Sequence, residues 1–157
     1  MRLLTAAALT LTLLGGWASG AGADVNASAK SGQTALMFAE IKGRERVARK
    51  LIESGAEVNA KDEIGETALW CAVGYGAASS AQIKALLDAG ADPDAQAPPR
   101  FRVTSLMTAA EHCRVDVVKV LIDGGAELDI RDQSDMTALT HASVGGCAAA
   151  AKLIRER

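Results

Sequence analysis

The sequence is poor in the residues that most often carry out catalysis or bind metals. It contains three cysteines and two histidines among 157 residues. None of the patterns G-x-x-x-x-G-K-S/T, H-E-x-x-H or G-x-S-x-G occurs, so phosphate loops, zinc proteases and serine hydrolases have no signature here. His112, Cys113, His141 and Cys147 also lack the C-x-x-C and H-x-x-x-H spacings typical of metal sites. We therefore predict no catalytic residues, no metal, no cofactor and no enzymatic activity.

The chain also lacks a strong net charge and an apolar run long enough for a membrane. Its formal charge is −2, and this mild acidity gives no electrostatic reason to bind nucleic acid or an anionic membrane. The N-terminal apolar run, Leu3–Leu14, is shorter than the about 20 residues that a membrane-spanning helix needs. We expect one domain from a chain of this length.

The first 23 residues have the pattern of a secretory signal peptide. Arg2 precedes the Leu3–Leu14 run, and small residues follow, with suitable cleavage points after Ala21 or Ala23. The alternative is a degenerate capping helix, which would need a polar outer face that Leu3–Leu14 does not offer. No cysteine lies near the cleavage points, so we expect no lipid attachment. We predict a signal peptide at residues 1–23 and a mature domain at residues 24–157.

One phrase occurs four times in the rest of the chain. It begins at Thr34, Thr67, Thr104 and Thr137, and the first two and the last two of these threonines are 33 residues apart. Each copy continues through an alanine-rich stretch and a loop into an apolar segment. The first three copies end at a glycine, the residue favoured just after a helix, followed by alanine and an acid. A fixed period near 33 indicates stacked repeats and not one closed core.

In order and spacing this phrase resembles the ankyrin repeat. Asp62, Gly65, Thr67, Leu69 and Ala72 match the family's D-x-x-G-x-T-P-L-H-x-A opening, and the segment 55–59, Gly-Ala-Glu-Val-Asn, matches its G-A-D-V-N close. The resemblance covers residues 24–157 and implies an all-α ankyrin-repeat solenoid of about four stacked helix-loop-helix repeats with hairpin-like turns. We place these repeats at residues 29–61, 62–98, 99–131 and 132–157.

Two features depart from the family's pattern. Other residues replace its proline and its histidine, and the second change should remove a hydrogen bond that commonly ties helix to turn. The replacements at the histidine position are Met37, Trp70, Met107 and Thr140. The second repeat is four residues longer than the period, and we expect two extra residues in the interhelical loop at 74–80 and two in the turn at 98–101. Such insertions often lie on the binding side of a repeat protein and could contribute to binding. The alternative is that they are tolerated changes of loop length without a function.

The three cysteines have different expected environments. Cys113 and Cys147 fall in the interhelical loops of neighbouring repeats, where they could form a disulfide in an oxidising compartment. That requires their Cα atoms to lie about 4.4–6.8 Å apart, and equivalent positions in adjacent repeats are usually farther apart. Cys71 lies in an alanine-rich first helix, and we expect it to pack as a small apolar side chain.

The resemblance implies protein binding on a concave face formed by the turn tips and the first helices. Ile64, Tyr75, Phe101 and Met136 are apolar residues at positions where solvent is expected, which suggests binding anchors. The alternative is that they are scattered surface residues, which are common. The complete predicted partner-binding set is Lys30, Gln33, Ile41, Lys42, Glu63, Ile64, Glu66, Tyr75, Phe101, Val103, Glu111, His112, Gln133, Ser134 and Met136.

We interpret the chain as a monomeric, exported ankyrin-repeat protein that binds another protein. We expect no nucleic-acid partner and no membrane association once the signal peptide is removed. The short signal, the small size and the aromatic content of 3% favour a bacterial source, and we expect the protein to be exported to the periplasm, with secretion as the alternative. The main alternative is an accessory or inhibitor protein that protects or blocks a specific periplasmic enzyme, and a third is a secreted factor that acts on a host.

Overall fold

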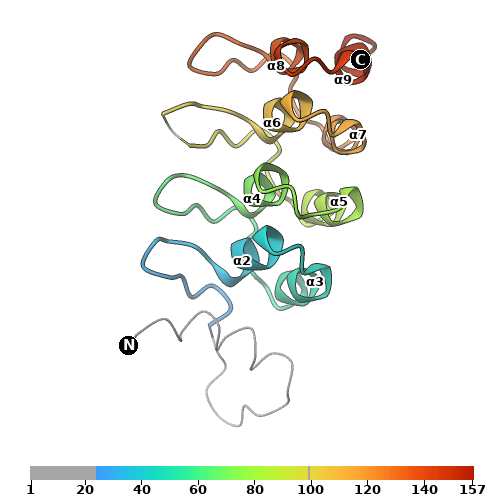
Figure 1. The fold of residues 1–157 in the computed structure, drawn as a ribbon. Coiled ribbons are helices and arrows are strands. Elements are labelled where there is room, and N and C mark those ends of the chain that lie inside the picture. The colour runs from blue at the N-terminus through green and yellow to red at the C-terminus, as the bar shows by residue number, and fades with distance from the viewer. Residues whose placement is uncertain (1–23, 99) are drawn as a thin grey trace.

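The computed structural model describes residues 24–98 and 100–157, which form four helix pairs stacked in one direction (Figure 1). A turn precedes each pair and projects away from the helices, to the left in Figure 1. The predicted signal peptide lies outside the described residues. The helices are α2 (Ala35–Ile41) and α3 (Glu45–Glu53), α4 (Ala68–Gly74) and α5 (Ser80–Asp88), α6 (Ser105–Glu111) and α7 (Val115–Asp123), and α8 (Ala138–Val144) and α9 (Ala148–Arg155). The stacked repeats that the 33-residue period indicates, and the all-α fold that the resemblance implies, are confirmed.

The repeated threonine begins the first helix of each pair. In three repeats its Oγ1 atom accepts a hydrogen bond from the backbone N–H three residues later, which satisfies one of the free donors at a helix start. In α2 and α6 the sulfur atoms of Met37 and Met107 accept 3.4 Å hydrogen bonds from the N–H groups of Thr34 and Thr104 in return. These methionines occupy the family's histidine position. The hydrogen bond between helix and turn whose loss the sequence predicts is therefore replaced by an N–H to sulfur bond in the first and third repeats.

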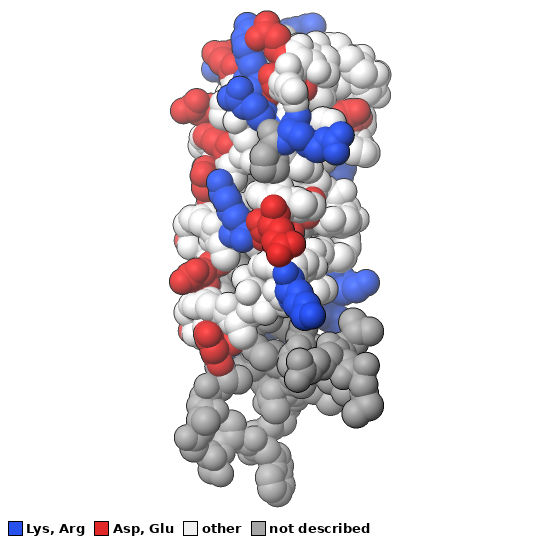
Figure 2. Space-filling view, turned by 90° about the vertical axis from the view of Figure 1, so that its left-hand side faces the viewer, with Lys and Arg blue, Asp and Glu red and all other residues white. Residues whose placement is uncertain are grey.

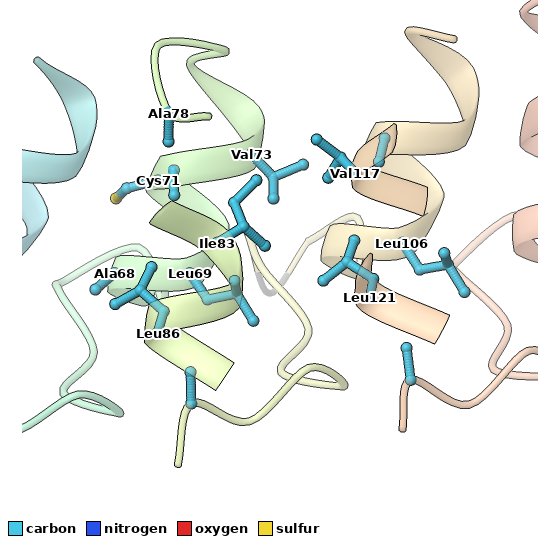
Figure 3. Packing of buried hydrophobic residues seen from close by; sticks show 14 of the residues in the cluster. Ala68, Leu69, Cys71, Val73, Ala78, Ile83, Leu86, Leu106, Val117 and Leu121 are labelled. Carbon is cyan, nitrogen blue, oxygen red and sulfur yellow. The ribbon is translucent and has the colours of Figure 1, made fainter. Parts of the chain in front are cut away.

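Leucines at one repeated position form the centre of the core. Leu51, Leu86 and Leu121 lie in the second helices of successive repeats, and each is 0% exposed. Figure 3 shows Leu86 and Leu121 in the two central repeats, beside Leu69 and Leu106 from the first helices. Burying such a side chain stabilises the fold by about 1.5–3 kcal/mol. Because a repeat packs only on its neighbours, the central repeats gain this contact on both sides.

The two insertions of the second repeat lie where the sequence predicts them. The loop between α4 and α5 covers residues 75–79, whereas the other interhelical loops have three residues each, at 42–44, 112–114 and 145–147. In the third turn, the N–H of Ala97 donates to the carbonyl of Val103 over six positions. The equivalent bonds of the other turns, such as that from Asp62 to Glu66, span four positions.

A disulfide connects the third and fourth repeats. Cys113 follows α6 and Cys147 precedes α9, and their Cα atoms are 5.2 Å apart, within the range that a disulfide requires. The approach is close because Gly145 packs on the end of α6, where any added Cβ would collide with the carbonyl oxygen of Glu111. Cys71 is fully buried in α4, and burial raises the pKa of its thiol far above the usual range, so it stays protonated.

Within residues 24–98 and 100–157, no helix has both the length and the apolar character needed to cross a lipid bilayer.

Candidate partner-binding face

One side of the stack (Figure 1) consists of the described residues of the four turns, at 28–34, 61–67, 97–98 with 100–103, and 131–137, together with the neighbouring exposed parts of α2, α4, α6 and α8. We call this side the binding face. Large apolar side chains that are well exposed in the described residues are Ile64 (51%), Tyr75 (52%), Phe101 (50%) and Val144 (67%). All four lie in the turns or at the ends of first helices, and none lies on the outer helices α3, α5, α7 and α9. The predicted exposure of Ile64, Tyr75 and Phe101 is confirmed.

Tyr75 is held in place by its own repeat. It caps the C-terminus of α4, and its hydroxyl donates a 3.3 Å hydrogen bond to Oε2 of Glu66. Its ring meets Trp70 edge-on, with ring centres 6.1 Å apart and an interplanar angle of 84°. Edge-to-face contact is a favoured aromatic geometry. The ring is therefore oriented toward the second turn while half of the residue stays in solvent.

The prediction that Glu66 contacts a partner is wrong, because this residue is only 3% exposed. Its carboxylate points inward and accepts hydrogen bonds from the Tyr75 hydroxyl and, at 3.8 Å, from the Cys71 thiol. Burial and the nearby charge of Asp62 raise the pKa of Glu66, and the hydrogen bonds only partly oppose this. Glu66 supports Tyr75 from beneath the surface.

Three apolar members of the predicted set are also less accessible than expected. Ile41 and Val103 are half-buried and pack against the hydrophobic core. Met136 is half-buried too, so the expectation that it stands in solvent is wrong. Gln33 is likewise half-buried. The structure leaves the remaining polar members exposed, namely Lys30, Lys42, Glu63, Glu111, His112, Gln133 and Ser134.

The repeat pattern did not reveal a buried polar network between the third and fourth repeats. His141, 5% exposed, places Nδ1 3.0 Å from Oε2 of Glu111 and Nε2 3.0 Å from Oδ2 of Asp132. Ionised carboxylates only accept hydrogen bonds, so both contacts are hydrogen bonds when the ring carries two protons and a positive charge. Glu111, predicted to contact a partner, therefore also helps to hold the fourth repeat against α6.

Asp132 shapes the fourth turn as well as binding His141. Its Oδ1 atom accepts hydrogen bonds from the backbone N–H groups of Ser134 and Met136, at 2.7 and 2.9 Å. Burial alone would raise the pKa of Asp132, but these bonds and the His141 contact outweigh it and lower the pKa. Asp62 forms the same turn in the second repeat, accepting from the N–H groups of Ile64 and Glu66. The second and fourth turns are thus fixed by inward-pointing carboxylates.

The histidines and cysteines do not converge on one point. Cys113 and Cys147 bond to each other, His141 lies between two carboxylates, and Nδ1 of His112 contacts the carbonyl of Thr108 at 2.9 Å. In the part of the chain that the structure describes, no three His, Cys, Asp or Glu side chains are arranged to hold a metal ion.

Comparisons with known proteins agree with this architecture. A family model for ankyrin repeats in three copies matches residues 6–97 and 75–157, so the first match begins inside the predicted signal peptide. The chain is 32% identical over 109 residues, 68% of its length, to the Ankyrin repeat and KH domain-containing protein mask-1 of Caenorhabditis elegans. It spans only 4% of that protein's length.

The chain therefore belongs to the ankyrin-repeat family. Ankyrin repeats are generally modules for protein–protein interaction, and the family is a non-enzymatic scaffold.

Proposed function

We propose that this chain is an exported module that binds one partner protein on its binding face. The observation that carries the proposal is the exposure of Ile64, Tyr75 and Phe101 in the second and third repeats, where each shows about half of its surface to solvent. Scattered exposed apolar residues are common, but here the outer helices have none of the large ones. Aromatic residues clustered near the middle of a surface are the usual anchors of protein interfaces.

The binding face is also well ordered, which favours affinity. The carboxylate of Glu66 fixes Tyr75, and backbone hydrogen bonds of 3.0 Å join neighbouring turns, from Glu63 to Ser31 and from Gln133 to Phe101. A surface that is rigid before binding loses less conformational entropy on association. The structure thus offers a preformed surface and not a flexible loop.

Export is supported by the N-terminal sequence pattern and by the disulfide. Disulfides persist in oxidising compartments such as the periplasm and the extracellular space, and are rare in the cytosol. In such a compartment the partner is an exported or surface protein. If that partner is an enzyme, binding at its active site would block it and binding elsewhere would protect it, which is the accessory or inhibitor alternative.

The proposal is tested by capturing partners from the extracellular or periplasmic fraction of the source organism. Wild-type protein and the double variant Tyr75→Ala/Phe101→Ala serve as parallel baits, with Arg49→Ala on α3 as the surface control. A specific partner should be retained by wild type and by the control, and lost with the double variant. Retention of the same partner by all three baits would place the interface elsewhere.

A further inference from the structure

Folding makes the turns more basic than their sequence suggests. The four turns contain equal numbers of basic and acidic residues, so their sequence is neutral. Three of the acids, Asp62, Glu66 and Asp132, are 8%, 3% and 9% exposed, because they point inward to shape the turns and to support Tyr75 and His141. The exposed acids that remain are Glu63 and Asp135, and Asp135 is already paired with Arg131 at 2.9 Å.

The basic residues of the turns all stay exposed. We call them the basic strip: Lys30, Lys61, Arg100, Arg102 and Arg131. Each turn contributes at least one member, so the strip runs the length of the stack, and Figure 2, seen from the turn side, shows basic side chains at successive levels of this face. Among the described residues no salt bridge involves Lys30, Lys61, Arg100 or Arg102, and only Arg102 of these four donates a side-chain hydrogen bond, from Nε to Oε1 of Gln96 at 3.2 Å. Most of the strip is therefore free to pair with charges on a partner.

Two exposed apolar residues, Phe101 and Ile64, lie in the same turns as the strip, and we call them the apolar centre. The guanidinium of Arg100 lies 4.9 Å from the ring centre of Phe101, a cation–π contact that holds the arginine beside the exposed ring. Ile64 occupies the equivalent position of the second turn. Hydrogen bonds join the first turn to the second and the third to the fourth, but the described residues include none between the second and third. Ile64 and Phe101 thus lie in two neighbouring turns between which the described residues form no backbone hydrogen bond.

We propose that the binding face recognises an acidic segment of its partner, with an apolar side chain that packs on Phe101 and Ile64 and carboxylates that pair with the basic strip. This rests on the proposed function, because it assigns a partner chemistry to the same face. Arginine suits this role, since its planar guanidinium binds a carboxylate through two parallel hydrogen bonds. Complementary charge would speed association and fix the register of the segment along the stack.

A polypeptide fits these observations better than a nucleic acid or an anionic lipid. The chain as a whole carries a net charge of −2, and Glu63 interrupts the strip, so an extended row of phosphates would meet repulsion as well as attraction. The apolar centre at Phe101 and Ile64 has a natural counterpart in a protein side chain.

The test presents a displayed library of random 12-residue peptides to the immobilised full protein. A triple variant, Lys30→Gln/Lys61→Gln/Arg100→Gln, is selected in parallel with a control of equal charge change, Arg46→Gln/Lys119→Gln/Arg155→Gln, on the outer helices. Wild type and control should enrich peptides rich in Asp and Glu with an aromatic or aliphatic residue among them. The Kd of the tightest such peptide should rise about tenfold or more in the triple variant, and should also rise with salt as charge screening increases.

Selection of neutral or basic peptides, or an unchanged Kd in the triple variant, overturns the acidic-segment proposal. If such peptides are nevertheless lost with Tyr75→Ala/Phe101→Ala, the proposed function stands and only the partner chemistry is wrong. Failure of wild type to enrich any peptide over the empty matrix counts against both. Binding of a 20-nucleotide single strand or of phosphatidylglycerol vesicles that the triple variant abolishes would assign the strip to phosphates and overturn the proposal.

Discussion

Nε2 of Gln82 donates a 2.7 Å hydrogen bond to Oε2 of Glu40, which joins the first helix of repeat one to the second helix of repeat two. Glu40 is 0% exposed, and its other carboxylate oxygen has no hydrogen-bond partner among the described residues. Burial raises the pKa of Glu40 to about 7, since the Gln82 bond opposes the shift only in part and the charge of Glu45 adds to it. The pair couples two repeats and also makes their stability depend on pH.

The sign of this dependence follows from proton binding. Between the ordinary pKa of 4.5 and the folded value of about 7, the folded protein holds the Glu40 proton and the unfolded chain releases it. The contribution of Glu40 to the free energy of unfolding is therefore largest below pH 4.5 and is lost as the pH rises through 7. The change is on the order of 3 kcal/mol. The variant Glu40→Gln should lack this pH-dependent change in stability. Urea unfolding at pH 5 and pH 8 measures the change, and an identical pH effect in wild type and variant would contradict the prediction.

Replacing the central core leucine should destabilise the whole stack. Leu86→Ala leaves a cavity between helices in a repeat that has neighbours on both sides, and should lower the free energy of unfolding by about 2–5 kcal/mol. Lys84→Ala on the same helix removes only an exposed ion pair with Asp88 and should change it by less than about 1 kcal/mol. Denaturant titration of both variants and wild type measures these changes. Equal unfolding midpoints for Leu86→Ala and wild type would contradict the placement of Leu86 in the core.

The disulfide predicts a count of free thiols. Protein purified from an oxidising compartment, denatured without reduction, should show one free thiol, that of Cys71. Three free thiols would rule the bond out. The bond closes a loop with a sequence separation of 34 residues, so Cys113→Ser should lower stability by about 2–4 kcal/mol relative to the oxidised protein.

Export predicts a processed N-terminus. Protein recovered from the source organism should begin at residue 22 or 24, after cleavage behind Ala21 or Ala23. N-terminal sequencing of protein from the culture medium and from each cell fraction decides this. A chain in the cytosolic fraction that still starts at Met1 or Arg2 would contradict export.

The period of the sequence was enough to predict the helix pairs, the turns and both insertions, because each depends on residues within one repeat. It could not predict which turn side chains face inward. Glu66 turns under the surface because Tyr75, in the lengthened loop, offers it a hydroxyl donor. His141 is buried because Glu111 reaches it from the preceding repeat. The first contact depends on the lengthened loop of the second repeat, and the second depends on the stacking of neighbouring repeats, so neither follows from the period of the sequence.

The central claim is that the exposed aromatic residues of the binding face bind the partner protein, and the variant Phe101→Ala tests it most directly. The partner recovered by affinity capture is titrated calorimetrically into wild type, Phe101→Ala and the control Arg49→Ala, after circular dichroism has shown that all three are folded. Phe101 is half-exposed and in contact with Arg100, so its loss should leave stability nearly unchanged. Loss of an aromatic hot spot costs at least about 2 kcal/mol, so the Kd should rise about thirtyfold, with Arg49→Ala unchanged. An unchanged Kd for folded Phe101→Ala would contradict the claim that this face binds the partner.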